Sequence, residues 1–389
     1  MILYILTFVA CLFADNVKQK SFKILLRIWL YIFLCFGYTV GSDWRNYEIM
    51  YTYTFDELQI FNPLYFLFNC LSSFCSYIGI DFWLYTGVCK CIFLSVVIYV
   101  IKQFTRKIFF VIALLLPAML LFFLIEGPFK FMLAMILMLC GFCCLLKKKK
   151  TQFWLLSFTS VFVHFAAAVI SILIFFLYTY KEKICKARFL YLFIFLLAST
   201  IISTFLSFFT TLSSTLNALL PLLQNKIEGY EVVSTENWLT LGSLVNYILF
   251  FILYYTRRRI LSIPKGDYLY AGAILARIMF GVCLVIPTGF RFNLFYELLS
   301  IIALSTICIN SVNDIHFPIV KFRKIAVVII IFYYSYNYVK TIWGAYQYLP
   351  YTNSIPYILQ GTSGDNYSKR SDLGFDNYYE RTGKRIDRE

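Results

Sequence analysis

Long apolar runs separated by short polar segments dominate this sequence. Many of the runs approach the 20 or so residues that an α-helix needs to cross a hydrocarbon core about 30 Å thick. Apolar and polar residues do not alternate within the runs, as they do in the strands of a membrane barrel. The pattern therefore predicts an all-α polytopic membrane protein with about 10–12 transmembrane helices. The clearest spans are residues 1–14, 24–40, 82–101, 108–125, 129–146, 189–211, 239–255, 268–286, 292–309 and 325–346.

The basic residues orient these spans. Most of the 35 Lys and Arg residues lie in short clusters between apolar runs, and such clusters mark the cytoplasmic side of a membrane. Both termini are then predicted outside, with outer loops at 42–60 and 212–238 and a polar extracytoplasmic tail at 347–389. The clusters lie at 18–23, 102–107, 147–150, 181–188, 257–265 and 321–324.

Two segments do not fit a simple succession of spans. Only one full crossing fits between the outer loop at 42–60 and the basic cluster at 102–107. We therefore expect the segment near 61–80 to be non-spanning or re-entrant. The segment near 151–180 lies between two inside clusters and needs an even number of passes, which two broken half-helices meeting near His164 would provide. Broken helices carry backbone polar groups that must face a cavity rather than lipid.

The composition excludes several classes of protein. Apolar residues make up 61% of the chain and charged residues 14%, against roughly 45–50% and 25% in soluble domains. A soluble enzyme, a disordered chain and a coiled coil are therefore excluded. The net charge of +15 is concentrated in the inside clusters, so we expect no nucleic-acid partner. The 12 Cys residues lie almost wholly in apolar runs without metal-ligand spacing, so we expect neither a metal nor a cofactor.

Ionisable residues near the outer ends of the spans are the candidates for function, because a charge within a membrane is expensive. Each also has a structural interpretation as a helix cap, a buried histidine or an interface anchor. The candidates are Asp43 and Arg45 after the second span, Lys130 after the turn at 126–128, His164 in the broken hairpin, Arg291 in a late outer turn and Arg277 deeper in the preceding span.

The chemistry of these residue types suits a sugar that carries a pyrophosphate. Arg binds phosphate through paired hydrogen bonds and Lys binds it as a point charge, so Arg291, Lys130 and Arg277 are the predicted pyrophosphate-binding residues. A carboxylate or a neutral imidazole can deprotonate an attacking hydroxyl, so His164 and Asp43 are the predicted catalytic residues. The sequence does not decide which of these two is the base.

Aromatic residues in the outer loops are the candidates for sugar recognition. Aromatic faces with polar tips suit sugars, although aromatic belts at the membrane interface have the same composition. We predict that Arg45, Tyr47 and Tyr230 bind sugar.

The order of these motifs resembles the EpsG-like group of Wzy-type polysaccharide polymerases over roughly residues 1–357. Lys130 stands where that group usually has Arg, and Asn62-Pro63 stands where it commonly has Glu-Pro. The resembling motifs are Gly41-Ser42-Asp43-Trp44 with Tyr47, Lys130-Phe131-Met132-Leu133-Ala134, Phe162-Val163-His164-Phe165-Ala166, Lys226 with Tyr230, Arg291 with Tyr296, and Tyr348-Leu349-Pro350-Tyr351.

The resemblance implies an enzyme at the outer face of the bacterial inner membrane. Such a polymerase transfers a growing glycan from undecaprenyl pyrophosphate to a sugar hydroxyl of the next lipid-linked repeat unit. Residues 1–346 would form the integral membrane polymerase domain. The implied partners are lipid-linked oligosaccharides, the bilayer and a chain-length regulator protein.

Other membrane functions stay open at this point. A transporter or flippase of lipid-linked sugars also needs cations, but its charges should extend through a central cavity between symmetric halves, and no internal repeat is visible. A membrane acyltransferase that modifies polysaccharide would also use His and Arg, with a cytoplasmic or central acyl-donor site. A purely structural assembly partner is the third alternative.

Overall fold

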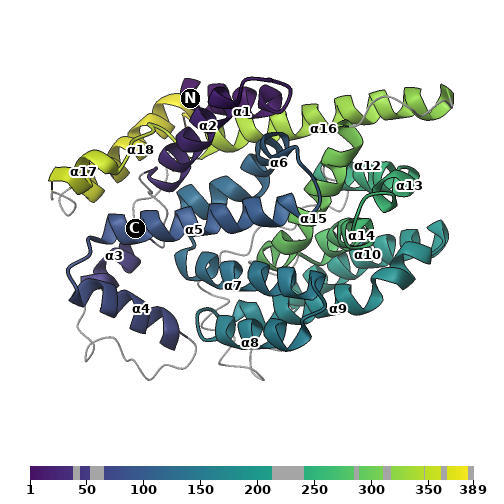
Figure 1. Cartoon of the computed structure of the whole chain (residues 1–389), viewed down its shortest axis with the longest axis horizontal. Coiled ribbons are helices and arrows are strands. Elements are labelled where there is room, and N and C mark those ends of the chain that lie inside the picture. The colour runs from purple at the N-terminus through teal and green to yellow at the C-terminus, as the bar shows by residue number, and fades with distance from the viewer. Residues whose placement is uncertain are drawn as a thin grey trace. The chain divides into compact units, whose positions relative to one another are not determined.

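All regular structure in the described part of the chain is helical, except for one isolated bridge between Gly37 and Asn353 (Figure 1). The computed structural model describes residues 1–37, 44–52, 65–212, 241–283, 289–309, 317–345, 347–360 and 366–383. The predicted all-α fold is therefore confirmed. Four described helical stretches are long and apolar enough to cross a membrane: Phe82–Lys102, Phe129–Leu146, Phe290–Cys308 and Phe322–Gly344.

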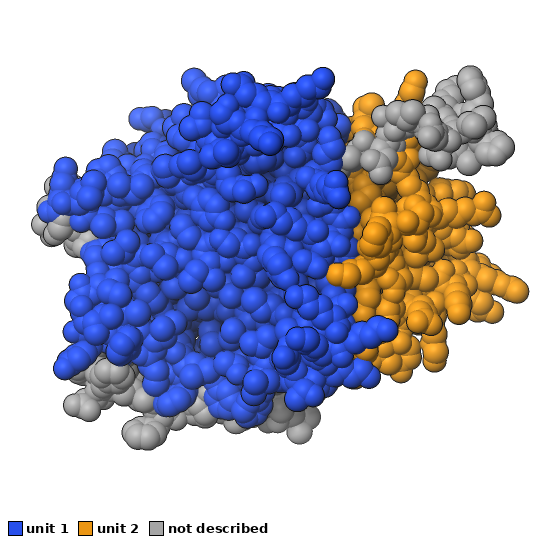
Figure 2. All heavy atoms as spheres, viewed as in Figure 1, with its two compact units in different colours: residues 1–172, 331–389 blue, residues 173–330 orange. Residues whose placement is uncertain are grey.

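The chain divides into two compact units, which Figure 2 distinguishes by colour. Unit 1 comprises residues 1–172 and 331–389, and unit 2 comprises residues 173–330. Unit 1 contains α1 (Ile2–Ala14), α2 (Lys20–Leu30), α3 (Trp44–Thr52), α4 (Phe66–Tyr77), α5 (Phe82–Lys102), α6 (Ile108–Leu115), α7 (Phe129–Leu146), α8 (Lys150–Val161), α17 (Ile355–Gln360) and α18 (Asn366–Thr382). Unit 2 contains α10 (Phe189–Leu212), α12 (Leu241–Tyr255), α13 (Arg257–Leu261), α14 (Gly266–Cys283) and α15 (Phe290–Ile309), while α9 (Ala166–Lys186) and α16 (Phe317–Gly344) cross the boundaries.

The span from residue 108 to 126 is the buried centre of unit 1, and it is irregular along its second half. The side chains of residues 111–116 are fully buried. After α6 the helix continues in wider π-helical turns, Leu116–Leu120 and Phe122–Glu126. Pro117 has no N–H to donate, which breaks the α-helical ladder at this point. Gly127 then adopts a left-handed φ of 78°, which a residue without Cβ tolerates, and the chain turns back into α7.

The two segments predicted to be irregular are irregular. α4 has 12 residues and is about 18 Å long at 1.5 Å per residue, too short to cross the hydrocarbon core. α8 also has 12 residues and ends before His164, which confirms the predicted break. α9, on the far side of the break, has 21 residues and is longer than the half-helix expected there.

Helices also form where the sequence suggested loop and tail. α3 lies inside the segment expected as an outer loop; it buries Tyr51, whose hydroxyl donates to the Ile80 carbonyl at 2.9 Å. In the tail, α18 contributes Arg381, which stacks on the Trp343 ring at 5.4 Å and donates to the Trp343 carbonyl at 2.7 Å. These helices are stabilised by long-range contacts that local composition does not reveal.

Unit 2 is organised around α14, which contacts α10, α12, α13 and α15. Two glycines allow close approach of its neighbours. A Cβ at Gly272 would lie 2.5 Å from Leu299 Cδ1, and a Cβ at Gly281 would lie 3.0 Å from backbone atoms of Ser199 and Thr200. Small residues at such crossings are typical of helix packing within membranes, where backbones meet directly.

We expect Gly281→Ala to destabilise unit 2 by about 1–3 kcal/mol, because the backbone of α10 cannot yield as a flexible side chain would. The measurement is thermal unfolding of the purified protein in detergent. Gly344→Ala is the matched control, since no atom lies within 4 Å of a Cβ at Gly344. Equal melting temperatures for the two variants would contradict this account of the α10–α14 contact.

Candidate functional site

Lys130 lies in the first turn of α7 and is surrounded by aromatic rings from α3 and α4 and the residue before α4. Its Nζ is 4.4 Å from the ring centre of Tyr65, 4.9 Å from Phe68 and 5.5 Å from Tyr47. A cation at a helix N-terminus opposes the helix dipole. The three ring faces offset this cost, at about 0.5–2 kcal/mol for each cation–π contact. The local fold therefore holds an ammonium group where the sequence alone would disfavour one.

His164 lies at the break between α8 and α9 and is half-buried. Its Nδ1 accepts a hydrogen bond from the Ala166 N–H at 3.2 Å, which satisfies one of the backbone donors in the first turn of α9. A neutral imidazole has one donor and one acceptor nitrogen. With Nδ1 accepting, the proton of a neutral imidazole lies on Nε2, which is then a donor.

Lys130 and His164 belong to one cluster, which we call the α7 cluster: Tyr47, Tyr65, Phe68, Lys130, Phe131 and His164. The His164 ring lies 5.4 Å from the Phe131 ring and 6.1 Å from the Tyr65 ring. Tyr65 thus contacts both the ammonium and the imidazole. The structure brings together three of the residues chosen from sequence: Tyr47, Lys130 and His164.

The segment after the last span ties two parts of unit 1 together. Tyr348 donates its hydroxyl hydrogen to the Glu126 carboxylate, next to the turn that precedes Lys130. Six residues on, the Ser354 N–H and hydroxyl both donate to the Phe36 carbonyl, at 2.8 and 3.0 Å. We call residues 347–354 the closing segment, because it joins the end of the second span to the turn before α7.

Glu48, on α3 next to Tyr47, was not singled out from sequence because its stretch was expected to be a solvated loop. Burial raises the pKa of its carboxyl to about 7, the nearby Trp83 side chain lowers this pKa, and the Asp81 carboxylate raises it. A carboxyl group that titrates near neutrality suits proton transfer. No local signal in the sequence indicates the contact with Trp83, which is 35 residues further along the chain.

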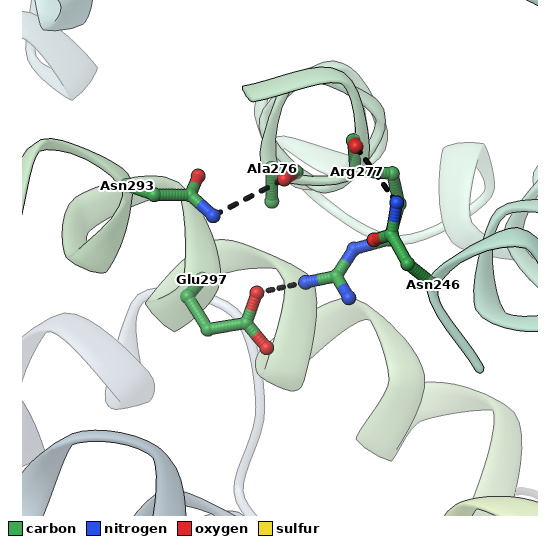
Figure 3. Close-up of polar contacts among 5 residues, drawn as sticks. All are labelled: Asn246, Ala276, Arg277, Asn293 and Glu297. Carbon is green, nitrogen blue, oxygen red and sulfur yellow. Dashed lines mark hydrogen bonds and ion pairs between the residues drawn. The ribbon is translucent and has the colours of Figure 1, made fainter. Parts of the chain in front are cut away.

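Unit 2 carries a buried ion pair between Arg277 on α14 and Glu297 on α15 (Figure 3). The Arg277 side chain is 4% exposed and that of Glu297 17%. Two amides frame the pair: Asn246 donates to the Arg277 carbonyl at 3.0 Å, and Asn293 donates to the Ala276 carbonyl at 3.2 Å. Glu297 neutralises Arg277 here, so this guanidinium is not a free cation.

The remaining predicted site residues are only partly described. Arg291 is half-buried in the first turn of α15 in unit 2. Arg45 lies on α3, but its side chain is outside the described residues. Asp43 and Tyr230 lie outside the described residues altogether, as does most of the predicted outer loop at 212–238. Their roles stay predictions.

The fold and its spans define a multi-pass α-helical membrane protein. Comparison with known protein families matches residues 2–353 to the EpsG family. The chain therefore belongs to the EpsG family, a family of Wzy-like polysaccharide polymerases. No curated protein and no solved structure matches the chain.

The buried Arg277–Glu297 pair predicts how the free energy of unfolding changes when one or both partners are replaced. Glu297→Gln leaves the Arg277 charge buried without its counter-ion and is expected to cost about 3–5 kcal/mol. The double variant Arg277→Met/Glu297→Leu should recover most of this loss, measured as thermal unfolding in detergent. Asp267→Asn is the control, since the Lys181–Asp267 pair is longer, 4.0 Å, and more exposed, and should lose only about 0–1 kcal/mol. Equal losses in Glu297→Gln and the double variant would contradict this account of the pair.

The raised pKa of Glu48 predicts a pH dependence of stability. The folded state holds the Glu48 proton more tightly than the unfolded state, whose pKa is near 4.5. The stabilisation is complete below about pH 4.5 and is lost as the pH rises through about 7. Glu48→Gln should remove this pH dependence. In the wild type the dependence amounts to a change on the order of 1 kcal/mol in the free energy of unfolding, once solvent screening is allowed for.

Melting temperatures between pH 5 and 8 measure the effect of Glu48. Glu182→Gln is the matched control, because Glu182 is exposed on α9. Parallel pH slopes for wild type and Glu48→Gln would overturn the assignment.

Proposed function

We propose that this chain polymerises undecaprenyl-pyrophosphate-linked oligosaccharide repeat units at the outer face of the bacterial inner membrane. Membership of a family of Wzy-like polysaccharide polymerases supports the reaction type. The observation that carries the site is the α7 cluster, in which a cation and an imidazole share one aromatic neighbour. The outer position follows from the basic clusters, which the positive-inside rule assigns to the cytoplasm.

The reaction forms one glycosidic bond and breaks one bond to pyrophosphate. The acceptor hydroxyl oxygen attacks the anomeric carbon of the lipid-linked donor, and the bond from that carbon to the pyrophosphate oxygen breaks. The hydroxyl proton passes to a base, and undecaprenyl pyrophosphate leaves with the bonding electrons. Negative charge therefore grows on the leaving group, where nearby cations stabilise the transition state.

Lys130 supplies such a cation. No described side chain caps the N-terminus of α7, so the positive end of this helix adds to the ammonium charge. The surrounding rings present apolar faces that suit a sugar, and Tyr47 is the member of the cluster that we assign to sugar binding, with Arg45 and Tyr230.

The hydrogen bond at Nδ1 refines the role of His164. Since Nε2 carries the proton, His164 acts as a donor to the leaving pyrophosphate oxygen rather than as the base. Deprotonation of the acceptor hydroxyl is then assigned to Asp43. Arg291 is proposed as a second pyrophosphate-binding cation, while Arg277 has a positioning role through its pair with Glu297.

The test is polymerisation in a strain that lacks its own polymerase and makes the cognate lipid-linked units. Wild type should produce a glycan ladder on a gel. Lys130→Met should reduce it to single repeats and Lys130→Arg should retain it, because the charge is what stabilises the leaving group. His164→Ala should lose the ladder, as removal of one hydrogen-bond donor to a developing negative charge costs about 10²–10³-fold in rate.

The variant His164→Asn tests the role of the imidazole in the reaction separately from its role as a hydrogen-bond acceptor at the start of α9. An Asn side chain can still accept the Ala166 N–H, as Asx turns do, but it cannot supply the imidazole. Loss of the ladder in His164→Asn, with normal amounts of protein in the membrane, supports the chemical role. A normal ladder in this variant would reduce His164 to a helix cap. Units stranded at the inner face without any ladder would favour a flippase instead.

A further inference from the structure

A shallow, wide-open apolar groove runs along one face of α5 in unit 1, and all of its lining residues belong to that helix. It has a volume of about 470 Å³ and is lined by Val88, Cys91, Ile92, Ser95, Val96 and Tyr99. These positions recur every three or four residues, so they form one helical stripe. From residue 88 to residue 99 the stripe is about 16 Å long at 1.5 Å per residue. That is about half of a hydrocarbon core of roughly 30 Å, or the depth of one leaflet.

The groove stays apolar because its polar atoms are already paired. The Ser95 hydroxyl donates to the Cys91 carbonyl at 2.7 Å and shares a hydrogen bond of 2.7 Å with the Tyr31 hydroxyl. Val88, Ile92 and Tyr99 are exposed in the isolated chain. In a span that crosses a membrane, such a face meets hydrocarbon.

Among the described residues, an exposed cation lies at the Tyr99 end of the groove, whereas Lys90, near the Val88 end, is buried and bonds the Gly37 carbonyl. Lys147, at the end of α7, donates to the Tyr99 hydroxyl at 3.1 Å. Lys147 is exposed, and its ammonium keeps two further N–H donors. This end also carries Lys102 in the last turn of α5, and the charge pattern predicts that it is cytoplasmic. Lys130 lies 17 residues earlier, at the opposite end of α7, so the α7 cluster is a separate site.

We propose that this groove binds an anionic phospholipid of the cytoplasmic leaflet. Its acyl chain lies along α5 from Tyr99 to Val88, and its phosphate pairs with the Lys147 ammonium. The groove length of one leaflet fits a single chain, and the cation at the headgroup end selects an anionic lipid. Each basic residue near such a surface contributes about a fivefold increase in affinity.

The experiment is native mass spectrometry of the purified full chain with dioleoyl phosphatidylglycerol or dioleoyl phosphatidylcholine. Wild type should retain phosphatidylglycerol preferentially. Lys147→Gln should weaken its retention about fivefold. Lys149→Gln, in the same exposed basic run, should leave it unchanged. Equal weakening by the two Gln variants would overturn the proposal, because it would indicate a diffuse charge effect.

Filling the groove tests the acyl chain separately. Ile92→Trp should reduce the retention of both lipids, whereas Ile194→Trp on α10, an exposed apolar position in unit 2, should not. Ile92 is 48% exposed, so the larger side chain displaces no core residue. Unchanged retention in Ile92→Trp, with a wild-type melting temperature, would also overturn the proposal.

Discussion

Polar groups in this chain must find partners inside the protein, because lipid hydrocarbon offers none. Several long-range hydrogen bonds of buried side chains meet this requirement. Lys90 is 2% exposed in the middle of α5, and its ammonium reaches the Gly37 carbonyl at 3.4 Å. Tyr338 donates to the Tyr4 carbonyl at 3.0 Å, and Tyr296 donates to the Leu173 carbonyl at 2.6 Å. Each of these hydrogen bonds joins segments far apart in the sequence. The need of buried polar groups for partners therefore also helps to determine which helices pack together.

The constraint explains why the spans were predictable and the site was not. A continuous apolar run by itself predicts a helix. The run at residues 129–146 predicts a membrane-spanning helix, and α7 is Phe129–Leu146. The break at His164 was predictable too, since it follows from counting passes between basic clusters. The rings around Lys130 come from α3 and the start of α4, more than 60 residues earlier, and no local pattern encodes that meeting. Glu48 was missed for the same reason.

The two units place positively charged side chains next to different kinds of partner. In unit 1 the ammonium of Lys130 lies against the faces of aromatic rings. In unit 2 Arg277 is held by a carboxylate, which neutralises it. The partners of the two cations thus differ in kind: aromatic rings surround Lys130, whereas a carboxylate neutralises Arg277 and joins two helices. A sequence shows both as a basic residue near a span, and only the contacts distinguish them.

The closing segment lies late in the chain, and this position affects when its hydrogen bonds form during synthesis. Residues 347–354 follow the predicted spans in this sequence, and domains fold as their residues emerge from the ribosome. Until then, the turn before Lys130 lacks its bond from Tyr348, and the end of the second span lacks its bonds from Ser354. A nascent chain that stops before Tyr348 would therefore lack the hydrogen bonds that join the end of the second span to the turn before α7. The turn before α7 and the end of the second span therefore gain their full set of hydrogen bonds only late in synthesis.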